Sequence, residues 1–337
     1  MTTERNTIGD DTAQGTQVVK VPKWTFITGI LVFVALIVFV YLHVGDARRF
    51  VQLAEQARPV WLILIVFLQI NTYVCIGLVW NRIMRSAGHR ISLREMTRLS
   101  VEKLSIDQLI PAVGISGNIA VFQAMKRLGV PRILALEAIL INLLARYIAY
   151  ALVAVVAVLT LWWYHDFTTV LLSLVGLFSI ILILVPLVII WLLARKGRPL
   201  PNWMRKIKPI VSLHEMIAEV DPGRVYSLRL MLYATVFNVF VFLLDSATLW
   251  AVLHSIGITA NYLTTFVAVV VATMAATLSL LPGGIGGFEA GCVAILTKLG
   301  IPIEAALTGT VLLRGFTLWL PLIPGLLFAR RDVIMKL

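Results

Sequence analysis

The chain alternates long apolar runs with short polar connections. Residues 1–23 are polar and without apolar periodicity, which predicts a disordered tail. A membrane-spanning helix needs about 20 consecutive apolar residues, so each long apolar run predicts one spanning helix. There are six such runs, at about 24–43, 60–81, 133–163, 168–194, 229–254 and 303–328.

Two further regions, 91–128 and 262–299, are interrupted by proline and glycine. The first break begins at Pro111, and the second reads L-P-G-G-I-G-G-F-E over 281–289. In each region the helix after the break is too short to cross a bilayer, so we predict two re-entrant helical hairpins. The amphipathic stretch 91–109 should lie at the cytoplasmic interface with its Arg and Lys on lipid phosphates, although a solvated connector is an alternative for its first half.

The two broken regions resemble each other at a constant offset of 171 residues. Seven of the 28 positions from 109 to 136 are identical to their counterparts without a gap, including Pro111 with Pro282 and Gly129 with Gly300. The same offset carries 60–81 onto 231–252 and 133–163 onto 304–334. We therefore predict a repeated unit of span, broken hairpin and span, over about 60–163 and 231–330. Chance similarity between apolar sequences is the alternative.

The amino-acid composition excludes several classes of soluble protein. The 337 residues are 60% hydrophobic and only 14% charged, with a net charge of +12. A soluble domain is about 45–50% apolar and about 25% charged, so a soluble enzyme, a nucleic-acid-binding domain and a disordered protein are excluded. The two cysteines, Cys75 and Cys292, form neither a disulfide framework nor a metal-binding spacing. We expect no cofactor and no metal.

The placement of basic residues predicts the topology. If both broken regions are re-entrant, 23 of the 29 Lys and Arg residues lie in the cytoplasm, 4 lie outside and 2 lie within spans. The loop 195–228 and both tails, 1–23 and 331–337, are then cytoplasmic, and the two repeats have opposite orientations. We predict an all-α polytopic membrane protein with one transmembrane domain over 24–330, inverted repeats, about six full spans and two re-entrant hairpins. Inverted repeats with broken helices are typical of transporters.

The hairpin tips are the first candidate binding site. A helix that begins inside the membrane offers free N–H groups and a dipole that favour an anion. Alternatively, the glycines serve only a tight turn and close packing, as in the small-residue motif formed by Gly287 and Gly291. The candidate tip residues are Pro111, Ser116, Gly117, Asn118, Pro282, Gly283, Gly284, Gly286 and Gly287.

Ionisable residues within the apolar segments are the second candidate. Arg146, Asp245 and Arg314 lie well inside predicted spans, and Glu289 lies in the second hairpin. A charge at the bilayer centre costs at least about 2.5–3.5 kcal/mol, so an ionisable residue at that depth is rarely there without a structural or functional role. Two interpretations stay open at this point: Arg314 pairs with Glu289 or Asp245 as structural support, or an arginine binds a phosphate bidentately.

The segment 281–289, the Leu-Gly pair at 299–300 and Arg314 together resemble the lysylphosphatidylglycerol synthase transmembrane-region (flippase-like) family. That resemblance implies an integral membrane protein that moves a lipid between leaflets, here as a stand-alone member without the soluble synthase domain. The positions that match the family motif are Pro282, Gly283, Gly284, Gly286, Glu289 and Arg314.

The sequence thus favours a lipid transporter of the bacterial inner membrane, not an enzyme, with both termini in the cytoplasm. Its partners are membrane lipids with a phospholipid or phosphate-bearing glycolipid headgroup, and no nucleic acid. Two alternatives stay open. One is an intramembrane lipid-headgroup transferase with Glu289 or Asp245 as general base. The other is a non-catalytic subunit of an envelope-lipid pathway for hopanoids or glycolipids.

Overall fold

The structure is a computed structural model that describes residues 58–109, 115–163, 168–195, 217–279, 281–322 and 324–325. All of these residues belong to one compact unit, which spans Gly45–Leu337. The predicted tail 1–23, the predicted span 24–43, most of the loop 195–228 and the tail 331–337 lie outside the described residues.

The described chain is all-helical, and no strand occurs within it. Six segments are long and apolar enough to cross a membrane, namely α2, α5, α6, α9, α10 and residues 303–322. The protein is therefore an all-α polytopic membrane protein, as predicted. The elements are α2 (Pro59–Ser86), α3 (Leu93–Leu109), α4 (Ile115–Arg127), α5 (Arg132–Trp163), α6 (Thr169–Ala194), α8 (Pro222–Val225), α9 (Leu228–Ser255), α10 (Tyr262–Ser279), the 3₁₀ turn η2 (Pro282–Gly284), α11 (Gly287–Lys298), α12 (Ile303–Arg314) and the π-helical turn η3 (Gly315–Trp319).

The helix α10 differs in part from the expectation. We predicted it as the first arm of a re-entrant hairpin, yet its 18 residues meet the length and hydropathy of a spanning helix. The following helix, α11, has only 12 residues and at about 1.5 Å per residue is too short to cross. The re-entrant course of this region stays a prediction, tested by the labelling experiment below.

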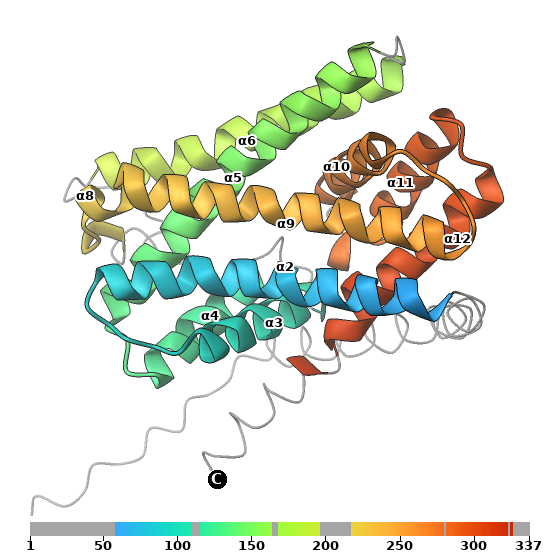
Figure 1. Ribbon diagram of the computed structural model, residues 1–337. Coiled ribbons are helices and arrows are strands. Elements are labelled where there is room, and N and C mark those ends of the chain that lie inside the picture. The colour runs from blue at the N-terminus through green and yellow to red at the C-terminus, as the bar shows by residue number, and fades with distance from the viewer. Residues whose placement is uncertain are drawn as a thin grey trace, which may run out of the picture. The chain divides into compact units, whose positions relative to one another are not determined.

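Two antiparallel helices, α2 and α9, pack along one another through the middle of the described helices (Figure 1). The start of α2 meets the end of α9, where the rings of Trp61 and His254 are 5.3 Å apart. The end of α2 meets the start of α9, where the Arg82 guanidinium lies 5.8 Å from the Tyr233 ring. These two helices are counterparts in the predicted repeat, so their antiparallel course agrees with an inverted arrangement.

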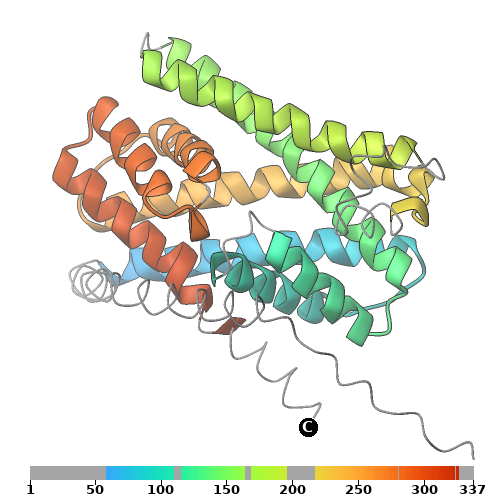
Figure 2. The ribbon, with the colours of Figure 1, turned by 180° about the vertical axis from the view of Figure 1, so that it is seen from behind.

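The order of neighbouring helices also occurs twice. In the first half α2 packs on α3, α3 on α4 and α4 on α5. In the second half α9 packs on α10, α10 on α11 and α11 on α12. Figure 2 shows the α3–α4 pair and the α10–α12 group in different parts of the molecule. The bounds of α4, shifted by 171, are 286–298, and α11 runs from Gly287 to Lys298.

The turns that follow α4 and α11 have the same backbone geometry. Gly129 and Gly300 both adopt a left-handed conformation, with φ of 77° and 90°. The next residue, Val130 or Ile301, donates its N–H to the carbonyl oxygen five residues earlier, at 3.0 and 2.9 Å. Only glycine takes this conformation without strain, which explains why the Leu-Gly pair occurs in both halves. The match favours a repeat in structure as well as in sequence.

Close contact between α10 and α11 depends on the small residues of α11. A Cβ added to Gly287 would lie 2.7 Å from the carbonyl oxygen of Ala275, and one added to Gly291 would lie 3.1 Å from the Cα of Ala272. Small residues let two helix backbones approach in a bilayer, where the hydrophobic effect contributes little. Gly287 is therefore a packing position, as the alternative interpretation of the glycine run proposed.

We predict that Gly287→Ala lowers the stability of the second hairpin. The added methyl group overlaps backbone atoms of α10 that cannot move without displacing the helix, a cost of about 1–3 kcal/mol. Thermal unfolding of the purified protein in detergent measures it. Gly176→Ala in α6 is the control, because nothing lies within 4 Å of the added Cβ. Equal unfolding temperatures for the two variants would contradict the packing role.

We predict that the paired positions Lys126 and Thr297 lie on opposite sides of the membrane. Both are exposed, both lie near the end of the second hairpin helix, and they differ by the repeat offset of 171. In a chain whose Cys75 and Cys292 are replaced by serine, an impermeant maleimide should label Thr297→Cys in intact cells. It should label Lys126→Cys only after permeabilisation. Labelling of both from the same side would rule out inverted hairpins.

Candidate functional site

A cavity of about 390 Å³ lies between α2, α3, α5, α9, α10 and α12. This volume is within the range of about 300–1,000 Å³ for small-molecule sites. Polar side chains from both halves of the chain converge on it. Its charged lining residues in the described chain are Lys103, Asp107, Arg146, Asp245 and Arg314.

The cavity brings together six of the residues predicted from the sequence. Arg146, Asp245 and Arg314 reach it from α5, α9 and α12, and Asn118, Gly283 and Gly284 reach it from the hairpin tips. Gly117, Gly286, Gly287 and Glu289 lie beside it and are not among its lining residues. Pro111 and the side chains of Ser116 and Pro282 lie outside the described part of the structure.

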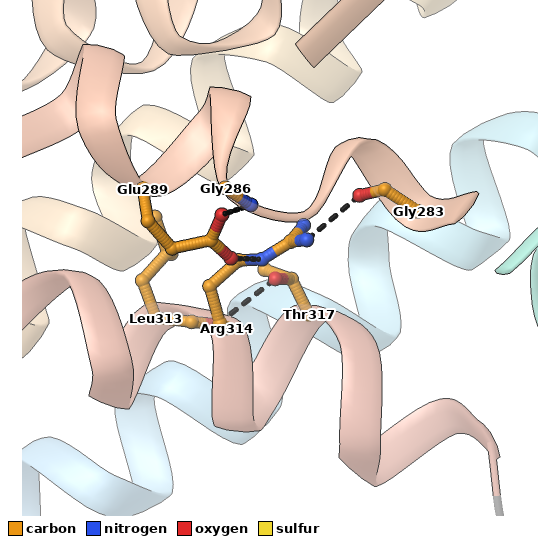
Figure 3. Close-up of polar contacts among 6 residues, drawn as sticks. All are labelled: Gly283, Gly286, Glu289, Leu313, Arg314 and Thr317. Carbon is orange, nitrogen blue, oxygen red and sulfur yellow. Dashed lines mark hydrogen bonds and ion pairs between the residues drawn. The ribbon is translucent and has the colours of Figure 1, made fainter. Parts of the chain in front are cut away.

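At the second hairpin tip, Arg314 is held by two partners (Figure 3). Its Nε donates to Oε1 of Glu289 at 2.6 Å, and its Nη2 donates to the carbonyl oxygen of Gly283 at 2.7 Å. The guanidinium also lies 4.9 Å from the centre of the Phe288 ring. Of the two interpretations of Arg314, its contacts support structural pairing, and Glu289 rather than Asp245 is the partner.

The N-terminus of α11 already carries an anion from the protein itself. The backbone N–H of Gly286 donates to Oε2 of Glu289 at 2.6 Å, so the carboxylate caps its own helix while it pairs with Arg314. Anion binding at this helix end stays a prediction, and the N–H of Gly286 is one group of the first turn that already has a carboxylate acceptor. The Glu289 carboxylate thus lies at the helix end where the helix dipole favours a negative charge.

The first hairpin tip also contains a trio of groups, namely a backbone N–H, a carboxylate that accepts from it, and a cation paired with that carboxylate. The N–H of Gly117, in the first turn of α4, donates to Oδ1 of Asp107 at 2.7 Å, and Lys103 pairs with the other oxygen of that carboxylate. Lys103 is buried. It therefore does not rest on lipid phosphates as expected for the basic residues of 91–109. In each half an N–H, a carboxylate and a cation meet beside the break: in the first half they join α3 to α4, and in the second half they join α11 to α12.

Arg146 differs from the other basic residues of the cavity. No carboxylate of the described chain lies within the 4.0 Å that defines an ion pair with it. Its guanidinium lies 5.9 Å from the centre of the Tyr150 ring, a cation–π contact within its own helix. Asp107 and Asp245 act on it electrostatically from a greater distance. The Tyr150 side chain also acts on it as a hydrogen-bond partner, so Arg146 is a cation of the cavity wall without an anionic partner in the described chain.

Asp245 is an acidic residue of the cavity that, like Arg146, has no ion pair in the described chain. Its Oδ1 accepts a hydrogen bond from Nε2 of Gln69 at 3.3 Å, and no cation of the described chain pairs with it. The Tyr73 hydroxyl lines the same cavity, interacts electrostatically with Asp245, and has no hydrogen-bond partner among the described residues. A buried hydroxyl without a partner costs about 1–3 kcal/mol, so this cavity wall favours a polar ligand.

Sequence reasoning missed several polar residues of the cavity, among them Gln69, Tyr73, Lys103 and Asp107. Gln69 and Tyr73 lie on the face of α2 that meets α9, but a single polar residue in an apolar run carries no distinctive signal. Lys103 and Asp107 did carry one, because their spacing of four residues places opposite charges on one helix face beside the predicted break.

A second hollow lies at the surface between α11 and α12. This groove has a volume of about 580 Å³ and is lined mostly by apolar side chains, including Val293, Ala294 and Leu307. Glu289 lies at its edge and Arg314, its ion-pair partner, lines the cavity. The Arg314–Glu289 pair therefore separates an apolar groove from the polar cavity.

These features define a polytopic membrane protein with a polar cavity between two similarly built helical groups. The family described as the lysylphosphatidylglycerol synthase TM region matches residues 26–325, and the chain belongs to that family. No curated relative matches the chain.

We predict that Arg314 and Glu289 contribute to stability as a pair. Arg314→Ala removes the ion pair, the bond to the Gly283 carbonyl and the contact with the Phe288 ring, so it should lower the unfolding temperature more than Glu289→Gln, whose amide oxygen can still accept from Arg314. A double-mutant cycle measured by unfolding in detergent should give a coupling energy of about 1–3 kcal/mol. Glu304→Gln, at an exposed position of α12, should show no coupling with Arg314→Ala. A coupling energy near zero for the Glu289 cycle would contradict the structural role.

Proposed function

We propose that the protein moves a phospholipid or a phosphate-bearing glycolipid between the leaflets of the bacterial inner membrane. In this proposal the headgroup enters the cavity and its phosphate binds Arg146. Arginine suits this role because its planar donors match two phosphate oxygens at once. The proposal includes both termini in the cytoplasm and transport without a covalent step or a cofactor.

One observation carries the proposal: the guanidinium of Arg146 faces a polar cavity without an ion pair in the described chain. The other two basic residues of the cavity are already committed, Lys103 to Asp107 and Arg314 to Glu289. A mid-membrane charge is costly, so an arginine kept without a carboxylate partner favours a ligand that supplies the anion. Membrane lipids are the nearest source of phosphate at this depth.

The groove between α11 and α12 supports a lipid rather than a free phosphate as the ligand. A lipid must keep its acyl chains in an apolar environment while its headgroup is in the cavity. The groove offers apolar surface next to the Arg314–Glu289 pair, which borders the cavity. We propose that an acyl chain lies in this groove during transport. Opposite repeats that exchange conformations would then open the cavity to each leaflet in turn.

Arg146→Ala tests the proposal. Loss of a charge-assisted hydrogen bond is worth about 1.5–3 kcal/mol, so transport should fall by about tenfold or more. The measurement is the leaflet exchange of fluorescent phosphatidylglycerol in vesicles that contain the purified full chain. Arg146→Lys keeps the charge and loses the bidentate geometry, so it should retain intermediate activity.

Arg132→Ala is the matched control, because Arg132 is an exposed arginine at the start of the same helix. It should exchange lipid at the wild-type rate. If Arg146→Ala folds and exchanges lipid as fast as Arg132→Ala, Arg146 does not bind the headgroup. If the wild-type chain fails to exchange any of a broad panel of phosphate-bearing lipids, the proposed function is wrong.

A further inference from the structure

The charges around the cavity balance when it contains no ligand. Lys103 pairs with Asp107, and Arg314 pairs with Glu289. That leaves Arg146 and Asp245, which are not in contact but act on each other electrostatically across the cavity. A positive and a negative group can compensate each other at such a distance because the surroundings have a low dielectric constant.

A phosphate bound to Arg146 disturbs this balance. A phosphodiester carries one negative charge and neutralises the guanidinium, so the Asp245 carboxylate loses its compensating cation. The described chain offers no other cation to compensate Asp245, because Lys103 and Arg314 are already paired with carboxylates. A carboxylate that is left without a cation at this depth is strongly disfavoured and binds a proton instead.

We propose that Asp245 takes up one proton for each phosphate-bearing lipid that binds, so that the protein is a lipid–proton symporter. This inference rests on the proposed function and adds its energy source. Asp245 takes a proton from water on one side when the lipid enters, forming a neutral carboxylic acid. It releases the proton to water on the other side when the lipid leaves. No electrons move, and no other bond forms or breaks.

The immediate neighbours of Asp245 suit a group that changes charge. From α2, Gln69 donates a hydrogen bond to it, and Tyr73 presents a hydroxyl without a partner among the described residues. Both are neutral, so they stabilise the carboxylate only weakly and tolerate the acid. The amide of Gln69 also donates to the hydroxyl of Thr248, which fixes its orientation.

The charged groups farther away are few. From α5 the cation is Arg146, with Tyr147 and Tyr150 beside it. From α3 there are Lys103 and Asp107, and from α12 there is Arg314, whose partner Glu289 belongs to α11. The sequences of α6 and α10 contain no Asp, Glu, Lys, Arg or His. Arg146 is therefore the one unpaired cation of the described cavity whose neutralisation changes the field at Asp245.

Symport of one anionic lipid with one proton is electrically neutral, which gives it a specific signature. A pH difference across the membrane should drive the lipid, whereas a membrane potential alone should not. Protons and lipid move in the same direction, so the lipid accumulates in the leaflet on the alkaline side. This result does not depend on the orientation in which the protein inserts into a vesicle.

The experiment uses vesicles that contain the full-length protein and phosphatidylglycerol with a fluorophore on one acyl chain. A pH difference of one unit is imposed, the potential is held at zero with potassium and valinomycin, and an impermeant quencher reports the outer leaflet. Wild type should enrich the probe on the alkaline side by up to about tenfold. Reversing the pH difference should reverse the enrichment.

Asp245→Asn should still exchange the probe but distribute it evenly under the pH difference. Because the variant moves the charged lipid without a proton, its distribution should respond to an imposed potential instead. Asp245→Glu keeps the carboxylate and should restore the pH response. If Asp245→Asn does not fold, a pH-sensitive dye inside wild-type vesicles should record one proton entering with each lipid.

The outcomes separate the two proposals. Lipid exchange by wild type with no response to pH overturns proton coupling and leaves the proposed function standing. Enrichment driven by a sodium gradient, or a full pH response in Asp245→Asn, also overturns the role of Asp245. No exchange of any phosphate-bearing lipid under any condition overturns both.

Discussion

At each helix break of this protein, one carboxylate accepts a hydrogen bond from a backbone N–H of the following helix and also pairs with a cation. Glu289 accepts from the N–H of Gly286 and pairs with Arg314, while Asp107 accepts from the N–H of Gly117 and pairs with Lys103. A helix that starts within a membrane leaves N–H groups without water, and here a carboxylate accepts a hydrogen bond from one of them at each break. The carboxylate itself then needs a cation. The breaks, and the cavity that they border, depend on these two trios.

Much of the architecture could be predicted from the sequence because it follows from periodicity and length. The apolar runs predicted α2, α5, α6 and α9, and the Pro/Gly breaks predicted where the hairpin helices separate. The repeat offset of 171 is reproduced by the turns after α4 and α11. The groups at the two tips do not follow this offset: Gly117 and Gly286 are 169 positions apart, and the carboxylates lie in helices that do not correspond, Asp107 in α3 and Glu289 in α11.

The site was harder to predict because a sequence states which charges enter the membrane but not which of them meet. Arg146 and Arg314 lie at similar depths in their predicted spans, so both were candidates for phosphate binding. Only side-chain geometry separates them: Arg314 reaches Glu289 at 2.6 Å, whereas Arg146 has no ion pair in the described chain. Likewise, Lys103 was assigned to the interface, and its pairing with Asp107 turns it inward.

The antiparallel contact between α2 and α9 has a consequence for how such a chain can arise. Two corresponding helices that pack antiparallel form a self-complementary surface, of the kind that identical subunits use in a twofold dimer. A single repeat that inserts in both orientations would already possess this contact. In a chain with the predicted inverted repeats, the residues between α5 and α9 join the two copies and so fix the ratio of the two orientations at one to one. Each copy afterwards becomes free to specialise, as the unequal positions of Arg146 and Arg314 illustrate.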